Sequence, residues 1–338
     1  MKFGTVSLWR DSTAAFVDEI RTAESLGFDL VGVGDTPGGY RELYVSLSVA
    51  ALNTSRVAVG PMVTNPVTRH PAVTASALGA LDRLSGGRVV LGIGTGGSAV
   101  WSLSRPPAKI DELRAYIETV RALMTRGEAT EDERHVVVSG IDRAFPVFVS
   151  AEGPRALRLA GALADGVILH AGTSVEAINW CLAAVAEGAA QAGRDPGQIE
   201  VWMMLKASIA GSREEALQEV KVGLAGSAQH ALRTGAAAKG VPPHLLEPVR
   251  ELVERYDVHQ HAMALSSNGD LVDELGLASF LADHFGLAGT PQDCVERLRT
   301  LEARGVHGVL IPAGGRDPLG LITRLGREVL PHLKSQDA

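Results

Sequence analysis

Short apolar runs alternate with amphipathic segments along most of the chain, and this alternation predicts the order of its strands and helices. Eight runs are rich in Val, Ile and Leu and are bounded by turn-forming residues, which is typical of strands. They cover residues 3–8, 28–34, 57–63, 88–93, 145–151, 166–170, 199–208 and 308–311. Because apolar residues fill these runs instead of alternating with polar ones, we expect a parallel sheet that is buried on both faces.

The segments between the runs have apolar residues three or four positions apart, which predicts helices. In the first of them Phe16, Ile20 and Ala23 share one stripe, and Gly27 ends the helix. Further helices are expected over residues 43–52, 110–124, 156–163 and 173–191. From about residue 226 to 285 the strand–helix rhythm is lost and the chain is helical in pattern, so we expect an insertion there, placed over the mouth of the sheet.

Eight strands that alternate with helices are the number that closes a (β/α)8 TIM barrel. The sequence therefore predicts an α/β fold in which residues 1–338 form a single barrel domain with a helical insertion at about 226–285. A doubly wound open sheet in two lobes is the alternative. Neither a domain linker nor a low-complexity tract interrupts the pattern.

Composition narrows the class of protein. Hydrophobic residues make up 46% of the chain and charged residues 21%, which supports a large core. A net charge of −7 argues against a nucleic-acid partner. Cys181 and Cys294 lie outside any CxxC motif, no uncharged apolar span is long enough to cross a membrane, and charged residues follow too early for a secretory signal. A cytoplasmic protein without a membrane partner is expected.

Two glycine-containing turns follow predicted strands. Residues 92–97, GIGTGG, formally match the dinucleotide fingerprint, but Pro106 and Pro107 delay the helix that this motif requires, so a loop that lets a ligand approach the backbone is the preferred interpretation. Gly153-Pro154 places proline at the start of a helix, whose free N–H groups suit a phosphate, with Ser150 and Arg155 beside it. An ordinary strand–helix turn is the alternative for this second site.

Polar residues at strand ends are the other candidates. Asp35, Thr64 and Asn65 follow predicted strands, where barrel residues bind or react, although Asp and Asn also cap loops. His259 and His261 are two positions apart without a carboxylate partner, so no metal site is expected. No G-x-S-x-G or Cys–His signature marks a nucleophile. The chemistry is therefore expected to belong to a bound cofactor.

Three segments carry a resemblance to a known family: VTNPVTRHP within residues 60–71, then ALDRLSGGRVVLGIG, then SAEGPRALRLAGALADGVIL. They resemble the bacterial-luciferase-like superfamily, and the TNPVTRHP segment resembles its branch with methylenetetrahydromethanopterin reductase and other coenzyme F420-dependent enzymes. The late segment GLAGTPQDCVERLRTLEARGVHGVLI is similar to the closing helix and strand of that superfamily. The resemblance implies a (β/α)8 barrel with a deazaflavin or flavin ring at its mouth.

Site residues follow from the resemblance position by position. It implies a non-proline cis peptide at Met62-Val63, and it places Asp35 and His70 as proton donors. Relatives often have Asp-His where this chain has Asp35-Thr36, which weakens a proton-transfer role for that loop. The implied cofactor-binding residues are Ser7, Asp35, Met62, Val63, Thr64, Asn65, Gly94, Thr95, Gly96, Ser150, Ala151, Glu152, Gly153, Pro154 and His170.

Three hypotheses of function follow. The first is an oxidoreductase that transfers a hydride between F420 and an unsaturated or carbonyl-type small molecule. The second is an FMNH2-dependent monooxygenase, and the third is a flavin-binding relative without activity. Because family members commonly dimerise, the resemblance also implies a homodimer.

Overall fold

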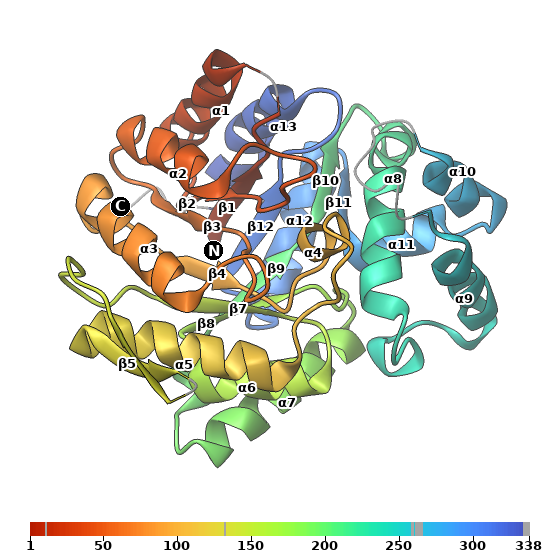
Figure 1. Cartoon of the computed structure of the whole chain (residues 1–338). Helices are drawn as coiled ribbons and strands as arrows, with labels where there is room; N and C mark the ends of the chain where they lie inside the picture. Colours follow the sequence, from red (N-terminus) through yellow and green to blue (C-terminus); the bar gives the residue numbers. More distant parts are fainter. Residues whose placement is uncertain (11, 132, 258–259, 261–265, 334–338) are drawn as a thin grey trace.

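The architecture is that of a parallel barrel with a helical insertion at one side (Figure 1). The structure is a computed structural model, and it describes residues 1–10, 12–131, 133–257, 260 and 266–333. The predicted pair His259 and His261 lies outside the described residues. Among the described residues, no helix is long and apolar enough to cross a membrane.

Eight parallel strands form the central sheet, in the order β3-β2-β1-β12-β9-β8-β7-β4. Their bounds are β1 Lys2–Ser7, β2 Leu30–Val33, β3 Ala58–Pro61, β4 Leu91–Ile93, β7 Val147–Ala151, β8 Gly166–Leu169, β9 Glu200–Met204 and β12 Gly308–Pro312. The two edge strands meet through the bridges Val59–Val89 and Thr64–Ile93, which close the sheet on itself. The predicted barrel is confirmed, and the open two-lobed sheet is wrong.

Side chains of the barrel strands alternate between two layers, as parallel barrels require. One set fills the barrel interior, including Val6, Met62 and Trp202. The other set faces the surrounding helices and joins the largest core cluster. Gly308 has no side chain because a Cβ there would come within 2.7 Å of the Trp202 ring. The bulk of Trp202 thus requires glycine at position 308 of the neighbouring strand.

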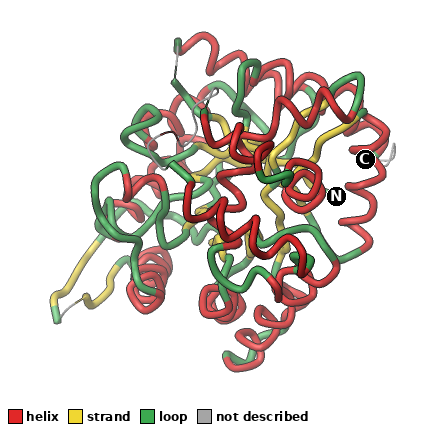
Figure 2. The backbone as a smooth tube through the Cα atoms, turned by 90° about the vertical axis from the view of Figure 1, so that its right-hand side faces the viewer, coloured by secondary structure: helices red, strands yellow, loops and turns green. Residues whose placement is uncertain are grey.

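Helices pack around the barrel between successive strands (Figures 1 and 2). They are α1 Thr13–Ser25, α2 Leu43–Leu52, α3 Pro71–Ser85, α4 Ser98–Trp101, α5 Ile110–Arg126, α6 Pro154–Leu163, α7 Val175–Gln191, α12 Pro291–Ala303 and α13 Pro318–Arg324. The start and end of α3 follow from its sequence, since Pro71 occupies the first turn and Gly86 ends the helix at φ 70°. A hairpin of β5 Glu128–Glu131 and β6 Arg134–Val137 and the helix α13 were not predicted.

The insertion is helical, as predicted, in the part that the structure describes. Its helices are α8 Arg213–Leu232, α9 Leu246–Arg255, α10 Ser267–Glu274 and α11 Ala278–Phe285. They share a hydrophobic cluster of their own, which includes Leu224, Leu252 and Leu281. The insertion lies to one side in Figure 1, with α8 next to the barrel. That all of this forms one domain stays a prediction.

The seventh predicted strand, residues 199–208, is two strands. β9 stays in the barrel, and after Leu205 the chain continues as β10 Lys206–Ile209. β10 leaves the barrel and pairs in parallel with β11 Gly286–Gly289, which directly follows the insertion. The continuous apolar pattern concealed this break, because both strands are largely buried. β10 and β11 therefore bracket the insertion.

A buried carboxyl group lies on the barrel-facing side of α1. Burial raises the pKa of Glu19 from 4.5 to about 7, and the neighbouring Ser7 offsets only part of the rise. The side chain of Ser7 thus faces α1, away from the barrel interior.

Glu19 gives a prediction for stability. Since folding raises the pKa of this carboxyl, the folded state binds the proton more tightly, and stability falls as the pH rises from 4.5 through 7. Glu19→Gln removes this titration. The free energy of unfolding of the variant minus that of the natural protein should therefore be roughly 3 kcal/mol larger at pH 8 than at pH 4. Urea unfolding at both pH values measures this, with the exposed Glu118→Gln as control. An equal effect at both pH values would contradict it.

Candidate active site

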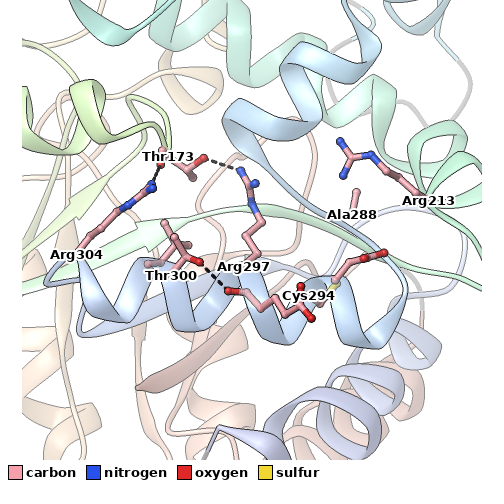
Figure 3. Close-up of a pocket in the computed structure, with 10 residues that line it drawn as sticks. Thr173, Arg213, Ala288, Cys294, Arg297, Thr300 and Arg304 are labelled. Carbon is pink, nitrogen blue, oxygen red and sulfur yellow. Dashed lines mark hydrogen bonds between the residues drawn. The ribbon is translucent and has the colours of Figure 1, made fainter.

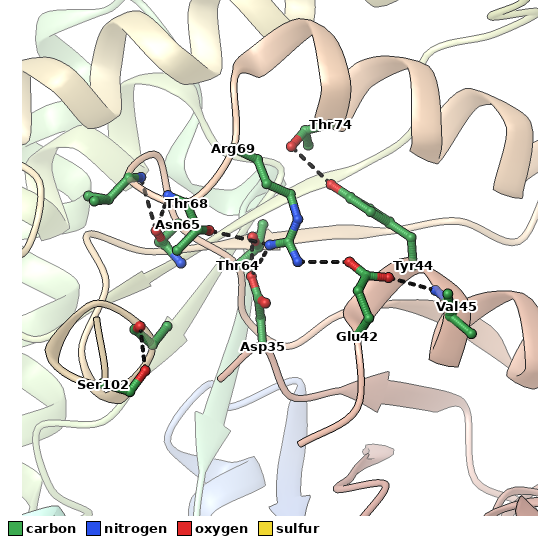
Figure 4. Close-up of polar contacts among 12 residues, drawn as sticks. Asp35, Glu42, Tyr44, Val45, Thr64, Asn65, Thr68, Arg69, Thr74 and Ser102 are labelled. Carbon is green, nitrogen blue, oxygen red and sulfur yellow. Dashed lines mark hydrogen bonds and ion pairs between the residues drawn. The ribbon is translucent and has the colours of Figure 1, made fainter. Parts of the chain in front are cut away.

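The carboxyl ends of the strands bring a polar network together at the barrel mouth (Figure 4). One carboxylate oxygen of Asp35, after β2, accepts hydrogen bonds from the Thr64 hydroxyl and the Arg69 guanidinium, each at 2.7 Å. Arg69 also donates to Glu42 at 2.9 Å. The Asp35 side chain is 2% exposed and that of Arg69 15%, so the pair is shielded from water. This network fixes the loops after β2 and β3 to each other.

Aromatic side chains extend the network into the helix layer. The Arg69 guanidinium lies 5.1 Å from the centre of the Tyr44 ring, a cation–π distance. The Tyr44 hydroxyl donates to Thr74, which in turn contacts the Tyr116 hydroxyl at 2.6 Å. Burial raises the pKa of Tyr44 to about 12, so the phenol stays protonated at neutral pH. These groups hold Arg69 and do not reach the mouth themselves.

The loop after β3 presents an unsatisfied donor. The predicted cis peptide at Met62-Val63 is confirmed. The side-chain oxygen of Asn65 accepts from the backbone N–H groups of Val67 and Thr68, at 2.9 and 3.1 Å. Its amide nitrogen is buried and has no partner among the described residues. Since buried polar groups are normally paired, this amide fits a ligand acceptor that would complete it.

Glycines leave room beside that donor. Gly94 follows β4, and a Cβ there would lie 3.4 Å from Ser150 and 3.6 Å from Val63, so the three residues line one space. Gly96 adopts φ 97°, a conformation that glycine favours, and passes close to Asn65. The Thr95 carbonyl accepts from Ala108, which secures the loop. Gly94 itself is buried, and Thr95 and Gly96 are partly exposed.

The helix α6 begins at the mouth with free N–H groups. Gly153 is its N-cap, Pro154 is at the first turn, and no side chain caps the helix. A Cβ at Gly153 would meet no atom within 4 Å, so the space above the helix start is open. Ser150 and Ala151 end β7 just before it. The residues present fit a phosphate group at a helix N-terminus.

A carboxylate between two histidines lies on the other side of the mouth. Glu152 contacts Nδ1 of His170 at 3.1 Å and Nδ1 of His230, from α8, at 3.8 Å. Burial alone raises the pKa of Glu152, but its contacts with the histidines hold it well below its usual range. The His230 ring packs 4.9 Å from Trp101 and against Gly97, where a Cβ would come within 2.8 Å of the ring. The insertion thus supplies a titratable group to the barrel mouth.

The second ring nitrogen of His170 contacts the hydroxyl of a serine. Ser227, also from α8, lies 3.0 Å from Nε2 of His170 and donates to the Gly223 carbonyl at 3.2 Å. Its single proton serves either Gly223 or the ring, so Ser227 accommodates both protonation states of His170. Burial lowers the pKa of His170, and Glu152 opposes this.

Lys206 adds a positive group nearby. It begins β10, and its side chain packs against Gly223 of α8. Burial lowers the pKa of its ammonium group, and the same charge lowers the pKa of His170. No carboxylate forms an ion pair with it in the part of the chain that the structure describes. Lys206 therefore places an amine without a carboxylate partner among the described residues near His170.

The structure separates the predicted site residues into two groups. Most of them gather at the mouth: Asp35, Met62, Val63, Thr64, Asn65, Gly94, Thr95, Gly96, Ser150, Ala151, Glu152, Gly153, Pro154 and His170. Ser7 points to α1, and exposed His70 caps α3 by accepting from the Ala72 N–H at 3.1 Å. Their proposed roles stay predictions.

Sequence reasoning missed the residues that other elements bring to the mouth. Arg69 lies inside the TNPVTRHP segment but acts on a loop 34 positions earlier. Ser227 and His230 are three positions apart on one face of α8, which was the available signal. Among the described residues, no group of three or more His, Cys, Asp or Glu side chains is arranged to hold a metal ion.

With this geometry established, comparison with known proteins defines the class. The chain belongs to the luciferase-like monooxygenase family, whose sequence model matches residues 1–308. It is 29% identical to 5,10-methylenetetrahydromethanopterin reductase of Methanolobus tindarius, over 98% of this chain and 100% of that protein. It is 27% identical to F420-dependent glucose-6-phosphate dehydrogenase of Nakamurella multipartita, over 93% of this chain and 90% of the relative.

A solved structure shows the same fold. It is the coenzyme F420-dependent tetrahydromethanopterin reductase of Methanopyrus kandleri, with a TM-score of 0.76 and 25% identity, covering 98% of this chain and 99% of that one. The similarity spans the barrel and the insertion together. The predicted membership of the superfamily is confirmed.

Proposed function

We propose that the chain is an F420-dependent oxidoreductase that transfers a hydride between the deazaflavin and an unsaturated or carbonyl-type small molecule. The observation that carries this proposal is the buried amide of Asn65, which has no partner among the described residues and lies next to Gly96 at the barrel mouth. The named relatives, which are F420-dependent enzymes, support the choice of cofactor.

Two groups of residues would hold two parts of the cofactor. Val63, Asn65 and Gly94 would hold the ring, and the N–H groups at the start of α6, with Ser150, would hold the phosphate. When bound, F420 supplies a two-electron hydride donor or acceptor. Asp35 and Arg69 keep the ring loop in place by their ion pair.

The proton that accompanies the hydride needs a group of the protein. Asp35 is engaged by Thr64 and Arg69, and His70 caps α3. Neither matches this role as well as Glu152 with His170 and His230, which we call the Glu152 cluster. His230 is the more exposed of the two histidines, 21% against 12% for His170, and is therefore the one that meets a substrate. In this proposal His230 exchanges the proton, and Glu152 orients it.

An FMNH2-dependent monooxygenase is the second candidate, because the family description names that activity. The same loop could hold a flavin ring, and cofactor binding separates the two functions. A small-molecule substrate fits both. We further propose a cytoplasmic homodimer without a nucleic-acid partner, in line with the net charge of −7 and the two free, buried cysteines.

Cofactor titration tests the proposed function. F420 should bind, seen as a change in its fluorescence, more tightly than FMN. Asn65→Asp keeps the acceptor that bonds Val67 and Thr68 but loses the amide donor, so it should weaken F420 binding about tenfold. The exposed Asn179→Asp serves as control. Tight FMN binding without any response to F420 would overturn the assignment in favour of the monooxygenase.

A further inference from the structure

A cavity lies between α12, β11 and the start of α8 (Figure 3). Its volume is about 330 Å³. Three of its lining residues are arginines, namely Arg213, Arg297 and Arg304, and Thr173 of the loop after β8 closes one side. No step of the proposed reaction uses this cavity.

Two of these guanidinium groups converge on one residue. Arg297 donates to the Thr173 hydroxyl at 2.6 Å and to the Asp283 carbonyl, and Arg304 donates to the Thr173 carbonyl at 2.9 Å. Neither forms an ion pair with a carboxylate among the described residues. The Nε–H of Arg297 is buried and has no hydrogen-bond partner there. Arg297 and Arg304 thus line the cavity without a carboxylate in ion-pair contact among the described residues.

Two carboxylates, Asp293 and Glu296, also line the cavity, but the carboxylates near the arginines already have other partners. Asp283 pairs with Arg213 at 2.5 Å. Asp293 accepts from Thr290 at the start of α12, and Glu296 accepts from Gln292 on the same helix. Burial lowers the pKa of Arg297, the charge of Asp283 opposes this effect, and the charges of Arg213 and Arg304 add to it. The like charges repel one another, and an anion between them would relieve that repulsion.

We propose that this cavity binds a small multivalent oxyanion, of the phosphate or carboxylate class, between Arg297 and Arg304. Planar guanidinium groups match such oxyanions through paired hydrogen bonds. The site is independent of the proposed F420 chemistry. Because Thr173 follows His170 by three positions, the bound anion fixes the loop between β8 and α7 next to the Glu152 cluster.

Thermal unfolding of the full chain in sodium phosphate, in sodium citrate and in sodium chloride of equal ionic strength tests this inference. Phosphate or citrate at ten times its Kd should raise Tm by about 3 °C in a saturable manner, beyond chloride. The two salts distinguish a phosphate ligand from a carboxylate ligand. Arg297→Gln and Arg304→Gln should each abolish the saturable rise.

Arg299→Gln is the matched control, since Arg299 is an exposed residue of the same helix that does not line the cavity. It should keep the response of the natural protein. If Arg297→Gln does not fold, Arg304→Gln alone decides. A Tm that rises equally in chloride, or a rise that persists in both cavity variants, would overturn the proposal and leave the arginines as braces for Thr173.

Discussion

Replacing Glu152 with glutamine should lower kcat for hydride transfer by about 100-fold, the lower end of what general acid–base catalysis contributes. Glutamine keeps the shape of the side chain but removes the charge that faces His170 and His230. The neutral amide no longer opposes the burial that lowers the pKa of His170. His230→Gln should cause a loss of similar size, because it removes the group proposed to exchange the proton.

A pH profile distinguishes this positioning role from a structural one. Glu152 raises the pKa of His170, whereas burial and the charges of Lys206 and His230 lower it. Without the carboxylate, the pKa of His170 should fall. The change in kcat/KM that accompanies loss of the His170 proton should therefore occur at lower pH. His244→Gln, at an exposed position of the insertion, is the control and should leave the profile unchanged. A Glu152→Gln enzyme with kcat within threefold of the natural one and the same profile would refute the role.

Replacing Arg69 with methionine should lower the free energy of unfolding by about 3 kcal/mol. The change leaves the carboxylate of Asp35, whose side chain is 2% exposed, with only the Thr64 hydroxyl as a side-chain partner. A buried charge that loses its counter-ion keeps its desolvation cost without compensation. Urea unfolding at pH 7 measures the loss.

A surface pair provides the comparison. Arg83 and Asp142 are bonded at similar distances, but their side chains are 66% and 63% exposed. Arg83→Met should cost less than about 1 kcal/mol, because water screens and replaces the interaction. Similar losses at both positions would show that burial of Asp35 and Arg69 does not set the strength of their pair.

The barrel was predictable because a strand that is buried on both faces is a continuous apolar run in the sequence. Every barrel strand coincides with an apolar run. The apolar run at residues 199–208 does not show that β9 ends before Leu205, because β10 is also largely buried and the two strands form one continuous pattern. The hairpin at residues 128–137 has no such pattern, because its second strand is mostly exposed.

The site was predictable where a residue follows its own strand. Asp35, Thr64 and Asn65 were chosen in this way, and the structure joins Asp35 to Thr64 by a hydrogen bond, while their roles stay predictions. Arg69 and His230 reach the mouth only through tertiary packing. The position of His230 depends on how α8 lies against the loop at Gly97, and a helix periodicity does not carry that information.

The pairing of β10 with β11 has a consequence for how this fold can diversify. The two strands run side by side through four pairs of residues, from Lys206–Gly286 to Ile209–Gly289, so the segment between them leaves and returns at one place. The entropy cost of closing such an excursion grows only slowly with its length, by about 0.6 kcal/mol for each doubling. The excursion can therefore be lengthened, shortened or exchanged while the barrel register stays fixed, and each exchange brings a new α8 surface against the same cofactor-binding loops.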